Sequence, residues 1–420
     1  MNTSVPAESA LSRLFPALGD PAVRLYLTGQ IVSVMGSWVL DITLNLLTWH
    51  LTGSPSSLGL LNFLIYAPTV VVTPLFSSIL TRANARRVTL RVIFGTLMVG
   101  LTLTVLMGTG LLSMTIIFMV AGVRGLLNGM EMPSRQMVMT AATDDPVRVA
   151  NAVAMNTMVF QVARMLGPAI AAAMFTTIGP TWAFGLSTAA FAFMLYCVLR
   201  LPVVESTEHM AAKVGPSGIR AAMKFVRYDR FGALFFPVTI SMAFFVGAYQ
   251  TLVPVLASRV YGDAATFTGM FFGAAGGGAL VAAIVLSSRF IMPAVKHLSV
   301  LMAWMIAAAL CLIGATRHAA VVMPCFFVIG FGLTMISTGT NAVMQRNAPS
   351  SLRGGLIGLF LAAYNGLLPL SQLLGGALAE WLNVRMTFVI MGSGLALTIL
   401  CFFAPRWLSH GRLVLDGEVI

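Results

Sequence analysis

Charged residues are scarce in this 420-residue chain, where they make up 9% of the sequence and only 13 are acidic. A soluble globular protein carries roughly 25% charged residues, so this scarcity excludes an ordinary soluble domain. Hydrophobic residues account for 58% of the chain. Apolar runs of about 20 residues, each long enough to cross a bilayer core of ~30 Å, recur along its whole length. The composition therefore predicts a polytopic membrane protein.

Residues that bind metals or perform catalysis are also few. The five histidines are scattered at predicted loops and helix ends, and no Ser/His/Asp set is recognisable. The chain lacks the Gly-Lys-Ser/Thr loop that binds nucleotide phosphates, which excludes an ATP-driven pump. We expect no metal, no cofactor and no enzymatic activity. The four cysteines lie in apolar segments without metal-ligand spacing and are interpreted as packed small side chains: Cys197, Cys311, Cys325 and Cys401.

The formal charge of +12 would suit a nucleic-acid binder, but the distribution of the basic residues indicates topology instead. Of the 25 Lys and Arg residues, Arg124 and Arg164 fall within predicted helices, and Arg259, Arg317 and Arg385 fall in loops on one side. The others lie on the opposite side. By the positive-inside rule, both termini are cytoplasmic. We expect a multi-pass protein of the inner (cytoplasmic) membrane, with no cleaved signal peptide and no nucleic-acid partner.

The apolar runs predict an all-α protein of twelve transmembrane helices in two six-helix pseudo-repeats. "DDPVRVANAVAMN" (Asp144–Asn156) echoes "NAPSSLRGGLIGLF" (Asn347–Phe360), six helices later. The predicted parts are a cytoplasmic segment (1–24), a first bundle (25–201), a cytoplasmic linker (202–232), a second bundle (233–404) and a cytoplasmic tail (405–420). The predicted helix cores lie near 25–47, 57–80, 88–112, 114–134, 148–175, 180–201, 233–258, 264–288, 294–316, 319–344, 354–379 and 386–404.

Several stretches, in the right order along nearly the whole chain, resemble the enterobactin-exporter branch of the major facilitator superfamily. They are "FPAL" (Phe15–Leu18), "LTGSPSSLG" (Leu51–Gly59), "NGMEMPSRQ" (Asn128–Gln136), "ANAVAMN" and "ARMLGP" (Ala150–Pro168), and "NAPSSLRGGLIG" (Asn347–Gly358). The resemblance implies two six-helix halves around a midplane site, with helices one, four, seven and ten lining the central cavity.

One loop departs from the family pattern. Between helices two and three the family usually has Gly-x-x-x-Asp-Arg-x-x-x-Arg-Arg, and here "SSILTRANARR" places Ser77 and Thr81 at the Gly and Asp positions. This loop braces the cytoplasmic gate in the family, and Thr81 carries no charge for an ion pair. Glu131 is interpreted as a substitute carboxylate, with an interfacial acid of no gating role as the alternative. The predicted cytoplasmic gate comprises Thr81, Arg82, Arg86, Glu131 and Arg135.

Three ionisable residues are predicted to lie deep in the membrane. At a rise of ~1.5 Å per residue, Asp41 and Arg164 lie ~24 Å from the cytoplasmic ends of helices one and five, and Arg124 lies near the midplane. An ionisable group at such depth is a functional-site hypothesis by default. We predict that Asp41 pairs with Arg124 or Arg164 in one state, and that its protonation releases the partner. The alternative is a permanent ion pair that only holds helices together.

The predicted substrate cavity is polar but uncharged. Helix ten carries a stripe of hydroxyl and amide side chains at helical spacing, which can bind substrate or can equally form interhelical hydrogen bonds. Asn62 and Tyr66, and Asn365 and Gln372, are weaker candidates. The predicted cavity residues are Asn45, Asn128, Tyr249, Gln250, Ser337, Thr338 and Asn341.

These features predict a monomeric, proton-coupled secondary transporter that exports a small amphipathic or anionic metabolite, such as a siderophore or drug. The deep charges of Asp41, Arg124 and Arg164 leave an excess of one positive charge, which favours an acidic substrate. Protons, the lipid bilayer and the small-molecule substrate are its predicted partners. An importer or lipid flippase of the same fold, and a transport-dead membrane sensor or scaffold, are the alternatives.

Overall fold

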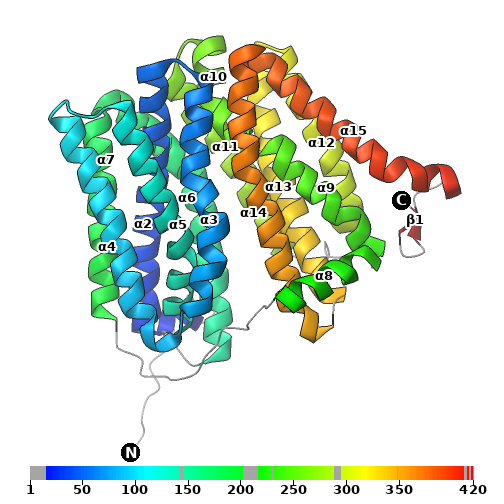
Figure 1. Cartoon of the computed structure of the whole chain (residues 1–420), viewed down its shortest axis with the longest axis horizontal. Coiled ribbons are helices and arrows are strands. Elements are labelled where there is room, and N and C mark those ends of the chain that lie inside the picture. The colour runs from blue at the N-terminus through cyan, green and yellow to red at the C-terminus, as the bar shows by residue number, and fades with distance from the viewer. Residues whose placement is uncertain are drawn as a thin grey trace, which may run out of the picture.

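The chain folds into long helices joined by short turns (Figure 1), in a computed structural model that describes residues 16–141, 145–201, 216–228, 230–287, 295–347, 349–410, 414–415 and 418–419. In chain order the elements are η1 (Pro16–Gly19), α2 (Pro21–Thr52), α3 (Pro55–Ile79), α4 (Arg82–Gly108), α5 (Met114–Ala141), α6 (Pro146–Thr177), α7 (Pro180–Arg200), α8 (Pro216–Tyr228), α9 (Arg230–Val246), α10 (Tyr249–Tyr261), α11 (Ala264–Ser287), α12 (Val295–Ala315), α13 (Ala319–Asn347), α14 (Ser350–Trp381), α15 (Val384–His410), β1 (Val414–Leu415) and β2 (Glu418–Val419).

Local sequence signals explain where the first helices begin and end. Asp20 and Ser54 precede α2 and α3, and their side chains accept hydrogen bonds from backbone amides of the first helical turn. Each cap is followed by a proline, which suits the first helical position because its missing N–H would have no partner there. Gly53 ends α2 in the left-handed conformation, at φ 59°. The tight turn between α2 and α3 therefore follows from four consecutive residues, "TGSP".

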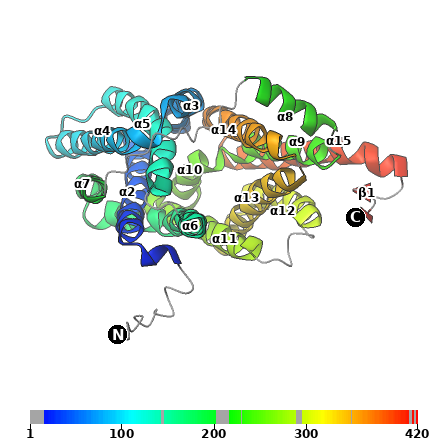
Figure 2. The same ribbon diagram turned by 90° about the horizontal axis from the view of Figure 1, so that it is seen from below.

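The helices form two groups that lie side by side. Helices α2 to α7 make the first group and α9 to α15 make the second, and the groups meet where α3 packs on α14 and α6 packs on α11 (Figures 1 and 2). We call the end with η1 and α8 the terminal end, and the end with the α2–α3 turn the distal end. Among the described residues, eleven segments are long and apolar enough to cross a membrane. The 32-residue α14 runs beside α3, in the position of one further span.

One predicted helix is interrupted in the structure. The sequence predicts a continuous helix over 233–258, whereas the structure ends α9 at Val246 and begins α10 at Tyr249. The hydroxyl of Ser371 in α14 donates to the backbone carbonyl of Phe244, which takes up a group near the break. Side chains from a neighbouring helix can thus satisfy backbone groups that a break leaves without intrahelical partners.

Small residues let the two groups of helices approach closely. A side chain on Gly59 of α3 would meet the carbonyl oxygen of Gln372 in α14 at 2.9 Å, and one on Gly376 would meet the α3 backbone. Such close approach is how helices associate in membranes, where the hydrophobic effect between them is lost. A continuous buried apolar cluster then joins the groups at the distal end, and it includes Leu58, Leu252, Leu256 and Phe271.

Candidate functional site

A buried network of ionised side chains joins α2 to α5 in the first group. Arg124 of α5 donates from Nη1 to Oε2 of Glu131 at 3.0 Å, and Nη2 of Arg135 lies 2.7 Å from the other carboxylate oxygen of Glu131. The Nε of Arg124 lies 3.6 Å from Oδ1 of Asp41 in α2. Arg124 is 1% exposed and Glu131 is 8% exposed. The two carboxylates and the two guanidinium groups balance, so the network buries no net charge.

The same network is tied to α2 by neutral side chains. Arg135 donates to the side-chain oxygen of Gln30 at 2.9 Å and to the hydroxyl of Ser33 at 2.7 Å. The hydroxyl of Tyr26 donates to the backbone carbonyl of Arg135 at 2.9 Å. Additional hydrogen bonds of this kind offset the cost of burying a charge, and here they engage both terminal nitrogens of Arg135, although its Nε has no partner among the described residues. Arg135 is therefore held by Glu131, Gln30 and Ser33 together.

The contact between Asp41 and Arg124 is the loosest link in this network. At 3.6 Å it is longer than a hydrogen bond, and neither Oδ1 of Asp41 nor Nε of Arg124 has a hydrogen-bond partner in the described part of the chain. The side chain of Asp41 is 17% exposed, against 1% for Arg124. Asp41 is thus the member of the network that can leave it most easily and that solvent reaches most easily.

An amide chain continues from Asp41 toward the second group of helices. Asn45 donates to the backbone carbonyl of Asp41 at 2.8 Å, and Asn62 of α3 donates to the side-chain oxygen of Asn45 at 2.8 Å. The same Nδ2 of Asn62 lies 3.3 Å from the hydroxyl of Thr251 in α10. Hydrogen bonds therefore connect the backbone of Asp41, through the side chains of Asn45 and Asn62, to Thr251 in the second group.

Arg164 of α6 stands apart from the network and lies near tyrosine side chains. It is partly buried, and the structure gives it no ion pair or hydrogen bond within the described residues. It lies near Tyr66 of α3 and Tyr364 of α14, and both of these tyrosines also lie near Tyr249 of α10. Tyr66 additionally interacts with Asp41 and Arg124. The four helices thus bring one positive charge and three phenols close to the ion network.

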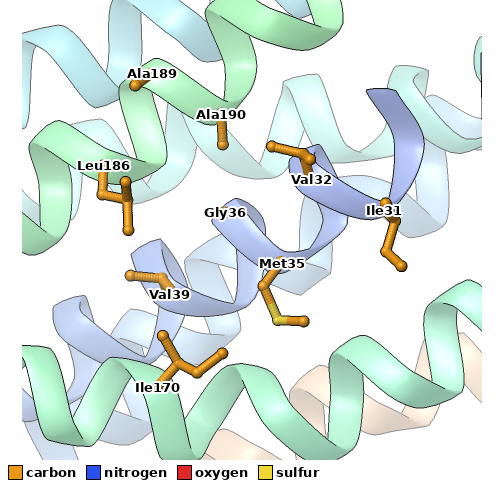
Figure 3. A pocket seen from close by; sticks show the side chains of 9 residues that line it. All are labelled: Ile31, Val32, Met35, Gly36, Val39, Ile170, Leu186, Ala189 and Ala190. Atoms are coloured by element: carbon orange, nitrogen blue, oxygen red, sulfur yellow. The ribbon is translucent and has the colours of Figure 1, made fainter. Parts of the chain in front are cut away.

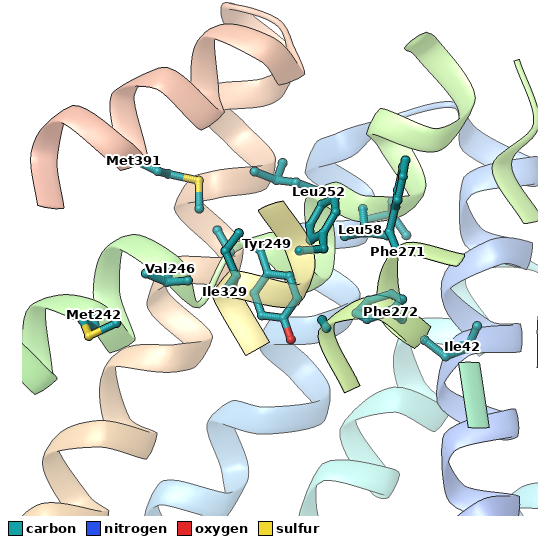
Figure 4. Packing of buried hydrophobic residues seen from close by; sticks show 14 of the residues in the cluster. Ile42, Leu58, Met242, Val246, Tyr249, Leu252, Phe271, Phe272, Ile329 and Met391 are labelled. Carbon is teal, nitrogen blue, oxygen red and sulfur yellow. The ribbon is translucent and has the colours of Figure 1, made fainter. Parts of the chain in front are cut away.

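Aromatic packing fixes one of these tyrosines in place. The ring of Tyr249 lies 6.1 Å from that of Phe272 and 6.4 Å from that of Phe326. Figure 4 shows its hydroxyl at the edge of the apolar cluster, pointing away from Leu252. The adjacent Gln250 accepts from the side-chain amide of Gln372 in α14 at 3.1 Å. The predicted cavity residues Tyr249 and Gln250 therefore open α10 directly after the break in this span.

Contacts between the two groups close the distal end. Glu380 at the end of α14 accepts from the hydroxyl of Ser54 at 2.9 Å and from the backbone N–H of Ser56 at 3.3 Å. Arg259 of α10 donates to the backbone carbonyl of Gly53 at 3.3 Å and lies over the ring of Trp49 at 5.6 Å. The α2–α3 turn is therefore held from the second group by a carboxylate and by a guanidinium.

We expect Glu380→Ala to favour opening of this distal end. The change removes two hydrogen bonds between the groups but leaves the cap of α3, because the Ser54 hydroxyl still accepts from Ser57. At about 1 kcal/mol net for each hydrogen bond, about 2 kcal/mol is lost in all, and the ratio of open to closed molecules should rise roughly 30-fold. Spin labels at positions 51 and 382 measure the separation across this end. Arg317→Ala, which removes an exposed distal charge, is the control, and equal distance distributions for both variants would contradict the expectation.

The other predicted gate residues serve local structure at the terminal end. Thr81 and Asn84 form a reciprocal cap at the start of α4. Arg86 donates to the backbone carbonyls of Val198 and Leu199 at 3.2 and 2.7 Å, which ties α4 to the end of α7. The side chain of Arg82 lies outside the described part. The structure thus brings Glu131 and Arg135 to the ion network, while Thr81 and Arg86 fix the neighbouring helix ends.

The polar side chains predicted to line the cavity from α13 form few hydrogen bonds among the described residues. Ser337 donates to the backbone carbonyl of Leu333 at 2.6 Å within its own helix, and Thr338 is exposed. The side chain of Asn341 is outside the described part, and Asn128 of α5 is half-buried. The structure therefore does not bring Ser337 or Thr338, the two α13 candidates whose side chains are described, to the ion network. No group of three His, Cys, Asp or Glu residues in the described ranges is placed to hold a metal ion.

An apolar groove of about 450 Å³ lies between α2, α6 and α7, apart from the polar site (Figure 3). Its rim residues Ile31, Ile170 and Leu186 are exposed, so the groove opens on the lipid-facing surface. Gly36 allows the close approach of α2 to α7 at its floor, where an added side chain would meet Ala190 at 2.7 Å. The groove is lined by apolar side chains and carries none of the predicted site residues.

Several residues of the site were not among the sequence-derived candidates. Gln30, Ser33 and Tyr26 hold Arg135, and Tyr364 lies near Arg164. A signal for the first set exists, because Tyr26, Gln30 and Ser33 recur at helical spacing on α2. Tyr364 immediately precedes the candidate Asn365. The sequence does not predict how α14 is rotated about its axis, and therefore it does not predict which of these two neighbours lies toward the site.

The two-group architecture and the buried polar site define a secondary transporter. The model of a family described as transmembrane secretion effector matches residues 13–409. The chain belongs to this family, within the major facilitator superfamily. It is 24% identical over 394 residues to the staphyloferrin A transporter of Staphylococcus aureus (strain NCTC 8325 / PS 47), covering 92% of this chain and 97% of that protein.

Solved transporters share the fold. The nucleoside transporter NupG superposes with a TM-score of 0.69 at 14% identity, covering 90% of this chain and 98% of that one. A POT family transporter in complex with 5-aminolevulinic acid gives 0.67 at 11% identity, covering 91% and 96%. The predicted twelve-helix major facilitator fold is confirmed. The family and these structural relatives are transporters rather than enzymes.

Proposed function

We propose that this protein is a proton-coupled exporter of a small anionic or amphipathic metabolite, with a siderophore as the leading substrate class. The observation that carries the proposal is a charge-balanced ion network beside Arg164, a cation for which the described residues provide no ion pair. A relative that transports staphyloferrin A supports this substrate class. In this proposal the terminal end faces the cytoplasm, both termini are cytoplasmic, and the protein works as a monomer in the inner membrane.

Arg164 is the proposed anchor for the anionic part of the substrate. A guanidinium presents several N–H donors in a fixed plane that suits carboxylate and related oxyanions. Tyr66, Tyr249 and Tyr364 add phenolic donors and flat apolar faces nearby. This combination suits an anion that carries ring or chain surface better than it suits an organic cation, which Arg164 would repel.

Asp41 is the proposed proton-coupling residue. It is the loosest member of the network, and Arg124 keeps a second carboxylate partner, Glu131, at 3.0 Å when Asp41 is neutralised. Protonation of Asp41 can therefore free it from Arg124 without leaving that guanidinium unpaired. Glu131 and Arg135 would carry the change to Gln30 and Ser33 on α2, nearer the terminal end.

We expect Asp41→Asn to fold but to lose proton coupling. The amide leaves two guanidinium groups sharing Glu131, but Asp41 is the most exposed and most loosely held member of the network, so the folded yield should fall much less than in a variant that loses Arg124. In proteoliposomes with an imposed pH gradient, uphill substrate transport should fall at least ten-fold, while substrate exchange without a gradient persists. Ser393→Ala, whose hydroxyl donates only to carbonyls of its own helix α15, is the control. Unchanged proton-to-substrate stoichiometry in Asp41→Asn would support a purely structural ion pair.

The direction of transport is tested in cells. A strain that lacks the gene should retain the siderophore it makes, and the intact gene should restore secretion. Retention that the intact gene does not reverse would favour a transport-dead sensor or scaffold. Reduced uptake of externally supplied siderophore in the deletion strain would favour an importer. Lipid that moves between leaflets only in proteoliposomes containing the protein would favour a flippase.

A further inference from the structure

The linker helix α8 lies at the perimeter of the second group of helices, at the terminal end of the molecule. It packs against α9 and α14, and in the view along the bundle it lies outside both of them (Figures 1 and 2). Helices α9 and α14 belong to the membrane-spanning bundle, so the space beyond them is occupied by lipid. A helix at the end of such a bundle and at its rim lies at the level of the lipid headgroups.

One face of α8 is buried in the protein. Ala222 is fully buried, Val226 is 6% exposed, and Phe225 is partly buried beside them. These residues lie within one turn of each other, which places them on the same side of the helix. The contacts with α9 and α14 therefore fix the rotation of α8 about its axis and determine which side chains face outward.

The outward face of α8 carries two basic and two amphipathic side chains. Met223 is 54% exposed and Tyr228 is 75% exposed, and the exposed Lys224 and Arg227 lie between them. The described part of α8 contains no acidic residue to pair with these charges. Tyrosine is enriched at membrane–water interfaces, and Lys and Arg extend their charged ends from apolar surroundings toward headgroups.

We propose that Lys224 and Arg227 bind the anionic headgroup of a phospholipid, with Met223 and Tyr228 resting on the adjoining acyl and glycerol region. The charge of the face is complementary to an acidic lipid. Its mixture of basic, aromatic and apolar side chains is typical of helices that lie in the interface. Because α8 also contacts α14, which packs on α3 across the two groups, lipid bound here lies beside a helix of the interface between the groups.

The experiment measures lipid contact at α8 itself. A fluorophore is placed at Met223→Cys in a chain whose exposed Cys401 is replaced by serine, and the protein is reconstituted with brominated phosphatidylglycerol or brominated phosphatidylcholine. We expect phosphatidylglycerol to quench at lower mole fraction than phosphatidylcholine. The preference is the ratio of the mole fractions of phosphatidylcholine and phosphatidylglycerol that give equal quenching. In Lys224→Gln/Arg227→Gln this ratio should fall about 25-fold, or about five-fold for each charge removed. A five-fold change corresponds to ~1 kcal/mol per basic residue near an anionic surface.

The control removes two exposed basic residues at the same end of the molecule. Arg87→Gln/Arg91→Gln lies on α4 in the first group and should leave quenching at position 223 unchanged. Equal quenching by the two lipids in the unmodified protein would overturn the proposal, as would an unchanged preference in the α8 variant. Both outcomes would point instead to a water-exposed face that binds an acidic protein or nothing. Neither depends on the transported substrate or on the direction of transport.

Discussion

Arg124→Gln is expected to destabilise the protein by about 3–5 kcal/mol, the cost of leaving a buried ion pair without one partner. Arg124 is 1% exposed and lies against both Asp41 and Glu131. Without its charge, two buried carboxylates share a single cation, Arg135. The folded yield in membranes should drop sharply, and the unfolding temperature in detergent should fall by several degrees.

A second substitution should restore much of this loss. In Arg124→Gln/Asp41→Asn, the remaining charges are Glu131 and Arg135, which lie 2.7 Å apart and form a complete pair. Arg135 also keeps Gln30 and Ser33. The double variant should therefore be more stable than Arg124→Gln, although it lacks the proposed coupling residue. Thermal unfolding of the two variants and of Asp41→Asn closes a double-mutant cycle.

The cycle tests whether the four side chains act as one charge-balanced unit. A double variant no more stable than Arg124→Gln would contradict this interpretation, because relief of the uncompensated carboxylate would then have no effect. Arg164→Gln serves as the control, since it removes a positive charge for which the described residues provide no ion pair. Its unfolding temperature should match that of the unmodified protein.

Depth along the helices predicted part of this network. Counting residues placed Asp41 and Arg124 far from the membrane surfaces, and the structure brings them within 3.6 Å. By the same count, Glu131 lies seven residues beyond Arg124, ~10 Å along the axis. This count treated each side chain as a point at its own Cα. Arginine and glutamate are long enough to close two helical turns, so Glu131 meets Arg124 at 3.0 Å.

Contacts between distant parts of the chain could not be predicted in this way. Glu380 and Ser54 are separated by 326 positions, and their contact depends on how the two halves are positioned in this conformation. No local pattern around Glu380 indicates its partner. The sequence "GSP" is enough to predict that Ser54 caps α3. The hydrogen bond from the same hydroxyl to Glu380 can be predicted only when the position of α14 is known.

The break between α9 and α10 shows a different limit. The apolar run over 233–258 is continuous, and hydropathy alone therefore predicts one helix. Gly247 lies at the break, and Pro237 and Pro254 lie on either side of it. These residue types favour an interruption of the helix, but the high hydropathy of the whole run favoured one continuous membrane span. Glycine and proline are tolerated in membrane helices because neighbours take up the freed backbone groups, as Ser371 does here.

Arg164→Gln is expected to raise the KM for an anionic substrate roughly 10- to 100-fold while the unfolding temperature stays unchanged. Hydrogen bonds to charged groups contribute about 1.5–3 kcal/mol each, which corresponds to this range for one lost contact. The structure gives Arg164 no ion pair with the described residues, so the fold has little to lose with the charge. Substrate uptake into inverted vesicles, measured over a range of concentrations, separates KM from kcat.

Two companion variants sharpen the result. Arg164→Lys keeps the charge but loses the planar donors, and it should fall between the unmodified protein and Arg164→Gln if the anion is held by geometry as well as by charge. Tyr364→Phe removes the hydroxyl of a tyrosine near Arg164 and should raise KM by a smaller factor. A kcat loss at unchanged KM in Arg164→Gln would instead assign this arginine to the conformational cycle. The excess positive charge would then act on Asp41 through Tyr66, which interacts with both, and substrate selection would lie with the uncharged side chains.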